Sequence, residues 1–186
     1  MSGSGAPGQV APAAHGMTVV IIAARWHERV MDGLLSGALR AAREAGAEAE
    51  VVRAVGSFEL PVLAAAAAER ADAVVALGVI IRGGTPHFDY VCRAATDGLA
   101  RVALDSGVPV GFGLLTCEDE AQALARCGGP GANEDKGHEA ACAAMDAQRA
   151  VSLCLAGTAP PWLTALDRGL GTVVGPEDPR RLARLW

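Results

Sequence analysis

Aromatic residues and basic clusters are scarce in this chain of 186 residues. Three Trp, three Phe and one Tyr make up 4% of it, so the core must be built from aliphatic side chains and alanine. Alanine-rich helices that would expose an apolar face commonly bury it against another subunit. Lys and Arg form no run and the net charge is -5, which argues against a nucleic-acid partner.

Long apolar runs are also missing. No stretch reaches the roughly 18–20 residues that a membrane span needs. No basic segment followed by an apolar one opens the sequence, as a secretion signal would. We therefore expect no membrane partner and a cytoplasmic location.

The cysteines lack the spacing of a metal site or a disulfide framework. There are five, an odd number, and no two form a C-x-x-C pair: Cys92, Cys117, Cys127, Cys142 and Cys154. Structural metals and disulfides need closer pairing than this. The expectation is buried, reduced thiols that act as small hydrophobic side chains, with no bound metal.

What the sequence does contain is a regular alternation of strand and helix patterns. Strands are predicted at 19–23, 51–52, 73–81 and 108–115, and helices at 28–45, 60–69, 88–104, 118–126 and 137–155. Apolar runs between helices are typical of a parallel sheet covered on both faces. The prediction is an α/β fold, a flavodoxin-like three-layer sandwich with a four-stranded parallel sheet. A flexible tail is expected at 1–17, the domain at 18–156 and an extension of unknown role at 157–186.

Polar and glycine-bearing clusters follow each predicted strand. They are Trp26-His27, the segment 56–59, the segment 82–87 and Thr116. In open α/β sheets, ligands bind beyond the carboxyl ends of the strands. The sequence therefore predicts a ligand site at that edge.

The strongest single motif is the run from Arg82 to His87, which reads Arg-Gly-Gly-Thr-Pro-His. Its two glycines suit a sharp turn near a ligand, while Thr85 suits a helix N-cap and Pro86 the first helical position. A helix N-terminus attracts anions such as phosphate. His87, predicted one turn into that helix, would stand beside the anion, and imidazole groups transfer protons near neutral pH. The alternative is a helix cap followed by a surface histidine.

Four other residues carry similar pairs of interpretations. Glu59 suits the hydroxyls of a polyol, or it merely complements a helix dipole. Trp26 suits stacking on a planar heterocycle, or packing. Arg126 and Lys136 flank a Gly-Pro-Gly linker and suit a phosphate, or they are ordinary surface charges.

Four segments together resemble one family. They are Gly78 to Cys92, Gly56 to Pro61, Pro109 to Thr116, and Asn133 to Ala141. Their order and spacing over about residues 17–156 are similar to those of the lumazine synthases. That family condenses 5-amino-6-ribitylamino-uracil with 3,4-dihydroxy-2-butanone 4-phosphate, a step of riboflavin biosynthesis that uses no cofactor.

The resemblance implies a role for each matching residue. Trp26 would stack on the pyrimidine, and Ser57 and Glu59 would hold the ribityl chain. The backbone of Val79, Ile80 and Ile81 would read the ring edge. Gly84 and Thr85 would form the phosphate loop, with His87 as the catalytic histidine. A neighbouring subunit would contribute Phe112, Arg126 and Lys136, with Arg126 on the phosphate.

The resemblance also implies a homo-oligomer with active sites between subunits. Family members form five-membered rings, and some form shells of twelve rings. Here Glu134 and Asp135 lengthen the linker before Lys136, and we expect their carboxylates to repel like charges at a symmetry axis. The prediction is therefore a pentamer or decamer. Two further departures from the family are Val55 in place of proline and His27 in place of asparagine.

Two other functions compete with lumazine synthesis. One is an archaeal-type riboflavin synthase, which resembles the family in fold. The other is a non-catalytic flavin-binding or shell protein. The complete Gly-Gly-Thr-Pro-His run favours the synthase over the first, and the joint presence of Glu59, His87, Arg126 and Lys136 argues against the second.

Overall fold

The computed structural model describes residues 10–156. The elements are β1 (Thr18–Ala23), α1 (Glu28–Ala45), β2 (Glu48–Arg53), a 3-10 turn (Ser57–Glu59), α2 (Leu60–Ala68), β3 (Ala73–Ile81), α3 (His87–Ser106), β4 (Val110–Cys117), α4 (Glu120–Leu124) and α5 (Lys136–Ala156). The four strands are parallel in the order β2-β1-β3-β4. The predicted α/β fold with a four-stranded parallel sheet is confirmed.

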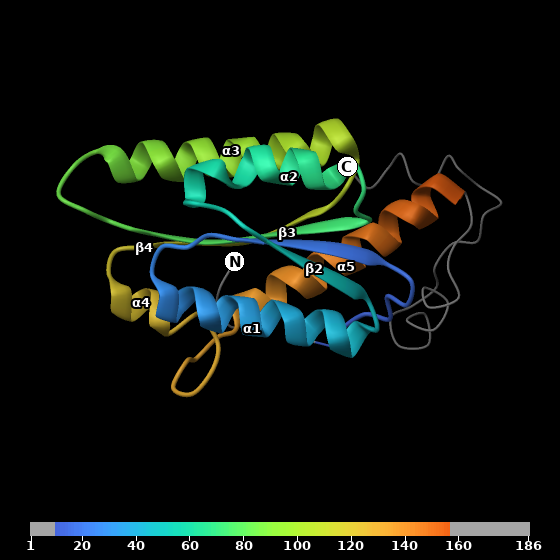
Figure 1. Cartoon of the computed structure of the whole chain (residues 1–186), viewed down its shortest axis with the longest axis horizontal. Helices are drawn as coiled ribbons and strands as arrows, with labels where there is room; N and C mark the ends of the chain where they lie inside the picture. The colour runs from blue at the N-terminus through green and yellow to red at the C-terminus, as the bar shows by residue number, and fades with distance from the viewer. Residues whose placement is uncertain (1–9, 157–186) are drawn as a thin grey trace, which may run out of the picture. The chain divides into compact units, whose positions relative to one another are not determined.

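Helices cover both faces of the sheet (Figure 1): α2 and α3 lie on one face, and α1 and α4 on the other together with the first part of α5. Alternate residues of β1 serve the two cores. Val19 and Ile21 pack with α1, whereas Val20 and Ile22 pack with α2 and α3. This strand is central and buried on both faces, which is why its sequence is uniformly apolar.

Small residues bring α5 close to its neighbours. A Cβ atom on Gly137 would lie 2.0 Å from the carbonyl oxygen of Leu34 in α1. A Cβ atom on Gly111 of β4 would lie 2.2 Å from the carbonyl oxygen of Ala140. Backbone therefore packs directly against backbone here, as expected of a core poor in aromatic side chains.

Most elements differ from their predicted bounds by one to three residues, and β2, β4 and α4 are the clearest cases. β2 begins at Glu48, before the predicted residues 51–52, because it is an edge strand whose first four residues are exposed and show no apolar pattern. β4 begins at Val110, after Pro109, which has no N–H to donate to a ladder. α4 ends at Leu124, so the predicted helix 118–126 is too long.

The chain divides into two compact units, Met1–Gln148 and Arg149–Trp186. In the second unit the structure describes residues 149–156, the end of α5. The predicted extension at 157–186 and residues 1–9 of the predicted tail lie outside the described residues. Within the described part of that tail, Ala14 is buried and donates its N–H to the carbonyl of Ala45 at 2.8 Å. Residues from Ala14 onward therefore pack with the domain.

Among residues 10–156, no helix has the length and apolarity that a membrane crossing requires.

Candidate active site

The sheet is staggered at its carboxyl edge. β3 pairs with β1 over Ala73–Leu77 and continues beside β4 as far as Ile81. The connections from β1 and β3 lead to opposite sides of this point, because β2 and β4 lie on either side of the central pair. Such a switch point is where ligands bind in open α/β sheets. The predicted clusters after the strands meet at this edge.

The end of β3 offers backbone groups toward the space beyond β1. Leu77 accepts a hydrogen bond from Ala24 on the β1 side, whereas Arg82 N donates to the Cys117 carbonyl on the β4 side. Peptide groups alternate between the two sides along a strand. Val79 and Ile81 therefore direct their N–H and C=O groups to the β1 side, past the last strand pairing there. Ile80 faces β4.

Trp26 and Glu59 converge on Gly56. The N–H of Gly56 donates to Glu59 Oε2 at 2.9 Å. A Cβ atom on Gly56 would lie 3.6 Å from Trp26 Nε1, so the indole borders the same peptide. The Trp26 side chain is 66% exposed. An accessible aromatic face and a carboxylate thus stand together at the carboxyl edge.

Ser57 is engaged within the chain. It is buried, and its hydroxyl donates to the carbonyl oxygen of Val79 at 3.4 Å. Gly78 leaves the room for it, since a Cβ atom there would lie 2.9 Å from Ser57 Oγ. The hydroxyl therefore joins the loop after β2 to the end of β3.

The loop from Arg82 to His87 is exposed, and it departs from the predicted helix start. The N-cap is Pro86 without a side-chain cap hydrogen bond, and α3 begins at His87. The predicted Thr85 cap and the placing of His87 one turn into the helix are therefore wrong. Pro86, with φ of -62° and ψ of -5°, occupies the N-cap position predicted for Thr85. Neither Gly83 nor Gly84 has a positive φ; both border open space, which leaves room for a ligand.

Arg82 fixes the two ends of this loop, a role that the motif alone did not reveal. Its Nε donates to Glu118 Oε2 at 2.8 Å, and its Nη1 lies 3.4 Å from Asp89 Oδ1. Its guanidinium also lies over the Phe88 ring, 4.1 Å from the centroid. The hydrogen bond to Glu118 raises the pKa of Arg82. The start of α3, and His87 with it, is thereby linked to the end of β4.

Phe112, Arg126 and Lys136 were assigned to the active site of a neighbouring subunit, and Phe112 lies away from the carboxyl edge where Trp26 and Glu59 meet. Phe112 pairs with Ala76, five residues before the end of β4 and so about 17 Å from the edge. It is 47% exposed on that edge strand. Arg126 follows α4, and its Nη1 donates to the Gln122 carbonyl at 2.8 Å. In contrast to Trp26 and Glu59, Phe112 therefore does not join the group at its own chain's sheet edge.

Lys136 is held by carboxylates of its own chain. Its Nζ lies 2.6 Å from both Glu134 Oε2 and Glu139 Oε2, and its side chain is 14% exposed. The hydrogen bond from Lys136 lowers the pKa of Glu134. An anionic ligand would have to compete with these two partners.

The linker carboxylates are not free to repel one another. Glu134 pairs with Lys136, and Asp135 pairs with Arg40 of α1. Asp135 also accepts a hydrogen bond from the N–H of His138 at 2.9 Å, at the start of α5. Both linker carboxylates therefore have ion-pair partners within the chain, which weakens the repulsion expected between subunits at a symmetry axis.

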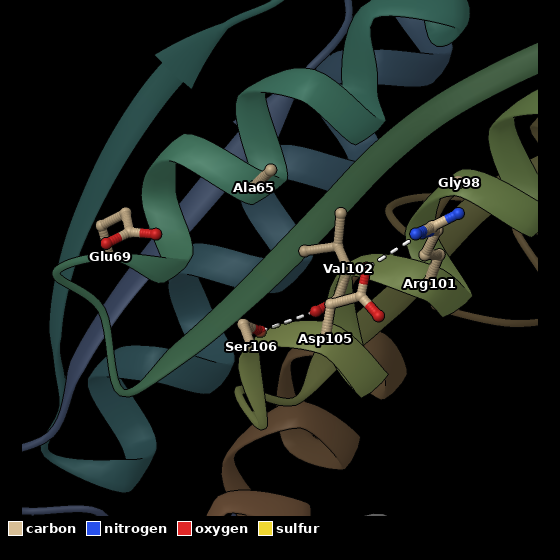
Figure 2. A pocket seen from close by; sticks show the side chains of 7 residues that line it. All are labelled: Ala65, Glu69, Gly98, Arg101, Val102, Asp105 and Ser106. Atoms are coloured by element: carbon tan, nitrogen blue, oxygen red, sulfur yellow. Dashed lines mark hydrogen bonds and ion pairs between the residues drawn. The ribbon is translucent and has the colours of Figure 1, made fainter.

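A hollow of about 340 Å³ lies between α2 and α3. Figure 2 shows its lining, with Arg101 paired to Asp105. The lining residues are Ala65, Glu69, Gly98, Arg101, Val102, Asp105 and Ser106. Because α3 begins at the carboxyl edge with His87 and ends at Ser106, this hollow lies toward the opposite edge of the sheet. None of the predicted site residues lines it.

The α1–α5 contact holds a buried histidine beside a thiol. His138 Nε2 lies 2.9 Å from Glu44 Oε2, and its Nδ1 lies 3.6 Å from Cys142 Sγ. Burial, followed by the nearby carboxylate of Glu44, raises the pKa of Cys142 to about 11. All five cysteines are free thiols. The expectation of burial is confirmed for Cys117 and Cys127, whereas Cys92 and Cys142 are half-buried and Cys154 is exposed.

Cys142 is expected to be alkylated slowly in the folded protein. With its pKa raised from 9.0 to about 11, its thiolate fraction at pH 8 is about one hundredth of that of an ordinary thiol. Iodoacetamide labelling followed by peptide mass spectrometry would measure this, with the urea-unfolded chain as the control. Equal rates in the two states would contradict it.

The same pKa shift predicts a pH dependence of the free energy of unfolding. Because the folded state favours the neutral thiol of Cys142, the free energy of unfolding should fall as the pH rises from about 9 toward 11. The Cys142→Ala variant should lack this contribution to the fall.

The fold and the candidate site define the class: a flavodoxin-like α/β protein with a candidate ligand site at the carboxyl edge of its parallel sheet. Residues 16–151, more than half of the chain, match the sequence model of 6,7-dimethyl-8-ribityllumazine synthase. The chain belongs to the 6,7-dimethyl-8-ribityllumazine synthase family. The match confirms the resemblance seen in the motifs and favours it over a riboflavin synthase.

Curated relatives from several organisms carry the name of this family. The protein of Frankia casuarinae is 62% identical over 148 residues, which span 78% of this chain and 92% of the relative. That of Renibacterium salmoninarum is 61% identical over 78% of this chain and 96% of the relative. That of Streptomyces avermitilis is 55% identical over 87% and 99%. Each is named 6,7-dimethyl-8-ribityllumazine synthase.

Proposed function

We propose that the protein is a transferase that condenses 5-amino-6-(D-ribitylamino)uracil with 3,4-dihydroxy-2-butanone 4-phosphate. The product is 6,7-dimethyl-8-ribityllumazine, a precursor of riboflavin, with release of phosphate and water. The observation that carries the proposal is the convergence, at one sheet edge, of an exposed indole, a carboxylate and an uncapped helix N-terminus. These three features suit the heterocycle, the polyol and the phosphate of the two substrates.

The start of α3 is the proposed phosphate site. α3 has 20 residues, and no side chain caps its N-terminus, so its positive end and its first N–H groups are available to an anion. Gly84 and Thr85 lie exposed just before it, with open space above Gly84. Arg82 holds this loop between β4 and α3. A phosphate here would replace water at groups that are already oriented.

The uracil is proposed to lie over Trp26, beyond the end of β1. Its polar ring edge would meet the N–H and C=O groups of Val79 and Ile81, which face this space, with Ile80 completing the strand beneath. Glu59 would accept hydrogen bonds from the ribityl hydroxyls, since charge-assisted bonds of this kind are strong. Ser57 stands at the same place, and its hydroxyl would shift from the Val79 carbonyl to a ribityl oxygen.

His87 is proposed to move protons during the condensation. It is exposed at the first position of α3, next to the proposed phosphate site. The uracil amine attacks the ketone carbonyl, water leaves to give an imine, phosphate is eliminated, and ring closure releases a second water. Each step adds or removes a proton, and an imidazole suits that task near neutral pH.

The active sites are proposed to lie between subunits of a homopentamer or of a decamer made of two such rings. Large apolar side chains are exposed in two places: Phe58 at 63% beside the candidate site, and Phe112 at 47% farther back on the edge strand β4. Exposed apolar patches of this kind are commonly covered by another subunit, and a ring satisfies every copy of such an interface. Arg126, Lys136 and Phe112 would then complete the site of a neighbour. Native mass spectrometry at physiological salt tests this, and a particle of sixty subunits would contradict it.

The proposed location is the cytoplasm. The five cysteines are free thiols in the structure, a state that a reducing compartment maintains. Cell fractionation would test this assignment.

Incubating the purified protein with both substrates tests the proposed reaction directly. We expect formation of the fluorescent lumazine and release of one phosphate per product. A protein that instead converts two lumazine molecules would be a riboflavin synthase. A protein that binds flavin but turns over neither substrate pair would support the non-catalytic alternative.

A further inference from the structure

The linker between α4 and α5 closes on itself beside Arg126. Lys136 N donates to the Arg126 carbonyl at 3.0 Å, and Gly128 N donates to the Glu134 carbonyl at 3.0 Å. Cys127 and Asp135 form an antiparallel bridge. Arg126 thus lies at the base of a closed loop, hydrogen-bonded to the residue that begins α5. A shift of that end of the loop would carry Arg126 with it.

Asp135 ties this base to two helices at once. One carboxylate oxygen accepts from Arg40 of α1, and the other accepts from the N–H of His138 in the first turn of α5 at 2.9 Å. Its side chain is only 18% exposed. The hydrogen bond to Asp135 raises the pKa of Arg40. An ion pair and a helix cap therefore share one carboxylate.

Two glycines make the room that this carboxylate occupies. A Cβ atom on Gly37 of α1 would lie 2.2 Å from Asp135 Oδ1. A Cβ atom on Gly128 would lie 2.7 Å from the Asp135 carboxyl carbon, and Gly128 also has a φ of +81°. The carboxylate is enclosed by α1, the linker and α5, so few positions are open to it.

We propose that Asp135 is a positioning residue that fixes Arg126 for the phosphate of the sugar substrate. The assignment rests on the proposed function, in which Arg126 binds that phosphate. Asp135 itself need not touch substrate. It acts through the base of the linker, whose backbone joins it to Arg126, and the ion pair with Arg40 anchors that base to α1. Both residues that lengthen the linker therefore form ion pairs at its base: Asp135 with Arg40, and Glu134 with Lys136.

The test is Asp135→Asn, because asparagine is as good an N-cap as aspartate and its side-chain oxygen still accepts from His138 N. The substitution removes the negative charge that forms the ion pair with Arg40. A small displacement of a binding group is costly, so we expect the KM for the sugar phosphate to rise about tenfold. The KM for the uracil and kcat should stay within about twofold of the wild-type values, because the Trp26 edge and His87 are untouched.

Three further variants sharpen this test. Arg40→Gln removes the same ion pair from the α1 side and should reproduce the KM change. Adding Asp135→Asn to Arg126→Ala should raise the phosphate KM no further, because a residue that acts through Arg126 has nothing left to position. Asp146→Asn, the same substitution at an exposed site within α5, is the matched control and should behave as wild type. Thermal unfolding of each assembled variant confirms that it is folded.

The outcomes separate the two proposals. No lumazine from the wild-type protein, or an unchanged phosphate KM in Arg126→Ala, would overturn the proposed function and the role of Asp135 together. If product forms and Arg126→Ala has its effect, a wild-type phosphate KM in both Asp135→Asn and Arg40→Gln would overturn the role of Asp135 alone. Equal rises in both substrate KM values would do the same, since they indicate a general loss of structure.

Discussion

Replacing His87 with alanine is expected to lower kcat by about one to three decades while leaving the KM for the sugar phosphate nearly unchanged. The first residue of α3 combines two functions that the substitution separates. Its backbone belongs to the helix N-terminus that is proposed to hold the phosphate, and the substitution retains it. Its imidazole is the proposed proton carrier, and the substitution removes it.

The matched control is His15→Ala. His15 is also exposed, but its ring lies against Gly46 after the end of α1, at the opposite edge of the sheet. The loss of the His15 ring should leave kcat and the KM for the sugar phosphate at their wild-type values. Steady-state assays of the two variants, following lumazine fluorescence, give the comparison. An unchanged kcat in His87→Ala would remove the imidazole from the mechanism, and a large rise in the phosphate KM would make it a binding group instead.

The bounds of α1 and β3 could be predicted correctly, because a local feature of the sequence determines each of them. The helix at 28–45 was placed correctly at both ends, because its apolar residues recur at helical spacing and Gly46 takes the left-handed conformation that ends a helix. β3 was also placed correctly, since a strand buried on both faces is apolar throughout. Their order then fixes the sheet edge where Trp26, Glu59 and His87 lie.

The errors arise where contacts between distant residues decide the structure. Thr85 has the right chemistry for an N-cap, yet the N-cap of α3 is Pro86. From the sequence alone, Asp135 reads as an added surface charge. Its ion pair with Arg40 of α1 could not be predicted, because the two residues lie 95 positions apart in sequence. The space for that contact depends on Gly37, a residue with no apparent signal of its own. Pairing of this kind follows from tertiary packing and not from local spacing.

Replacing Arg126 with alanine is expected to raise the KM for the sugar phosphate by about 30- to 150-fold and the KM for the uracil far less. A charge-assisted hydrogen bond to an anion contributes on the order of 2–3 kcal/mol, and its loss leaves the phosphate with the α3 N-terminus alone. One guanidinium N–H already serves the Gln122 carbonyl, and a guanidinium has five such donors. Steady-state kinetics with each substrate varied in turn measure the difference. Equal effects on both substrates would contradict the assignment.

Mixing two inactive variants tests whether Arg126 serves its own chain or a neighbour. His87→Ala and Arg126→Ala subunits are unfolded together in equal amounts, refolded and assayed at a sugar-phosphate concentration where each alone is nearly inactive. In a ring with sites between subunits, a site is intact when one chain supplies His87 and its neighbour supplies Arg126, so random assembly restores about one quarter of the sites. If both residues act within one chain, no mixture contains an intact site, and activity stays at the mean of the two parents. Refolding each variant separately before mixing provides the control, because preformed rings do not exchange their halves of a site. Recovery only after joint refolding would place Arg126 in a neighbour's active site, whereas its absence from correctly assembled mixed rings would refute that placement.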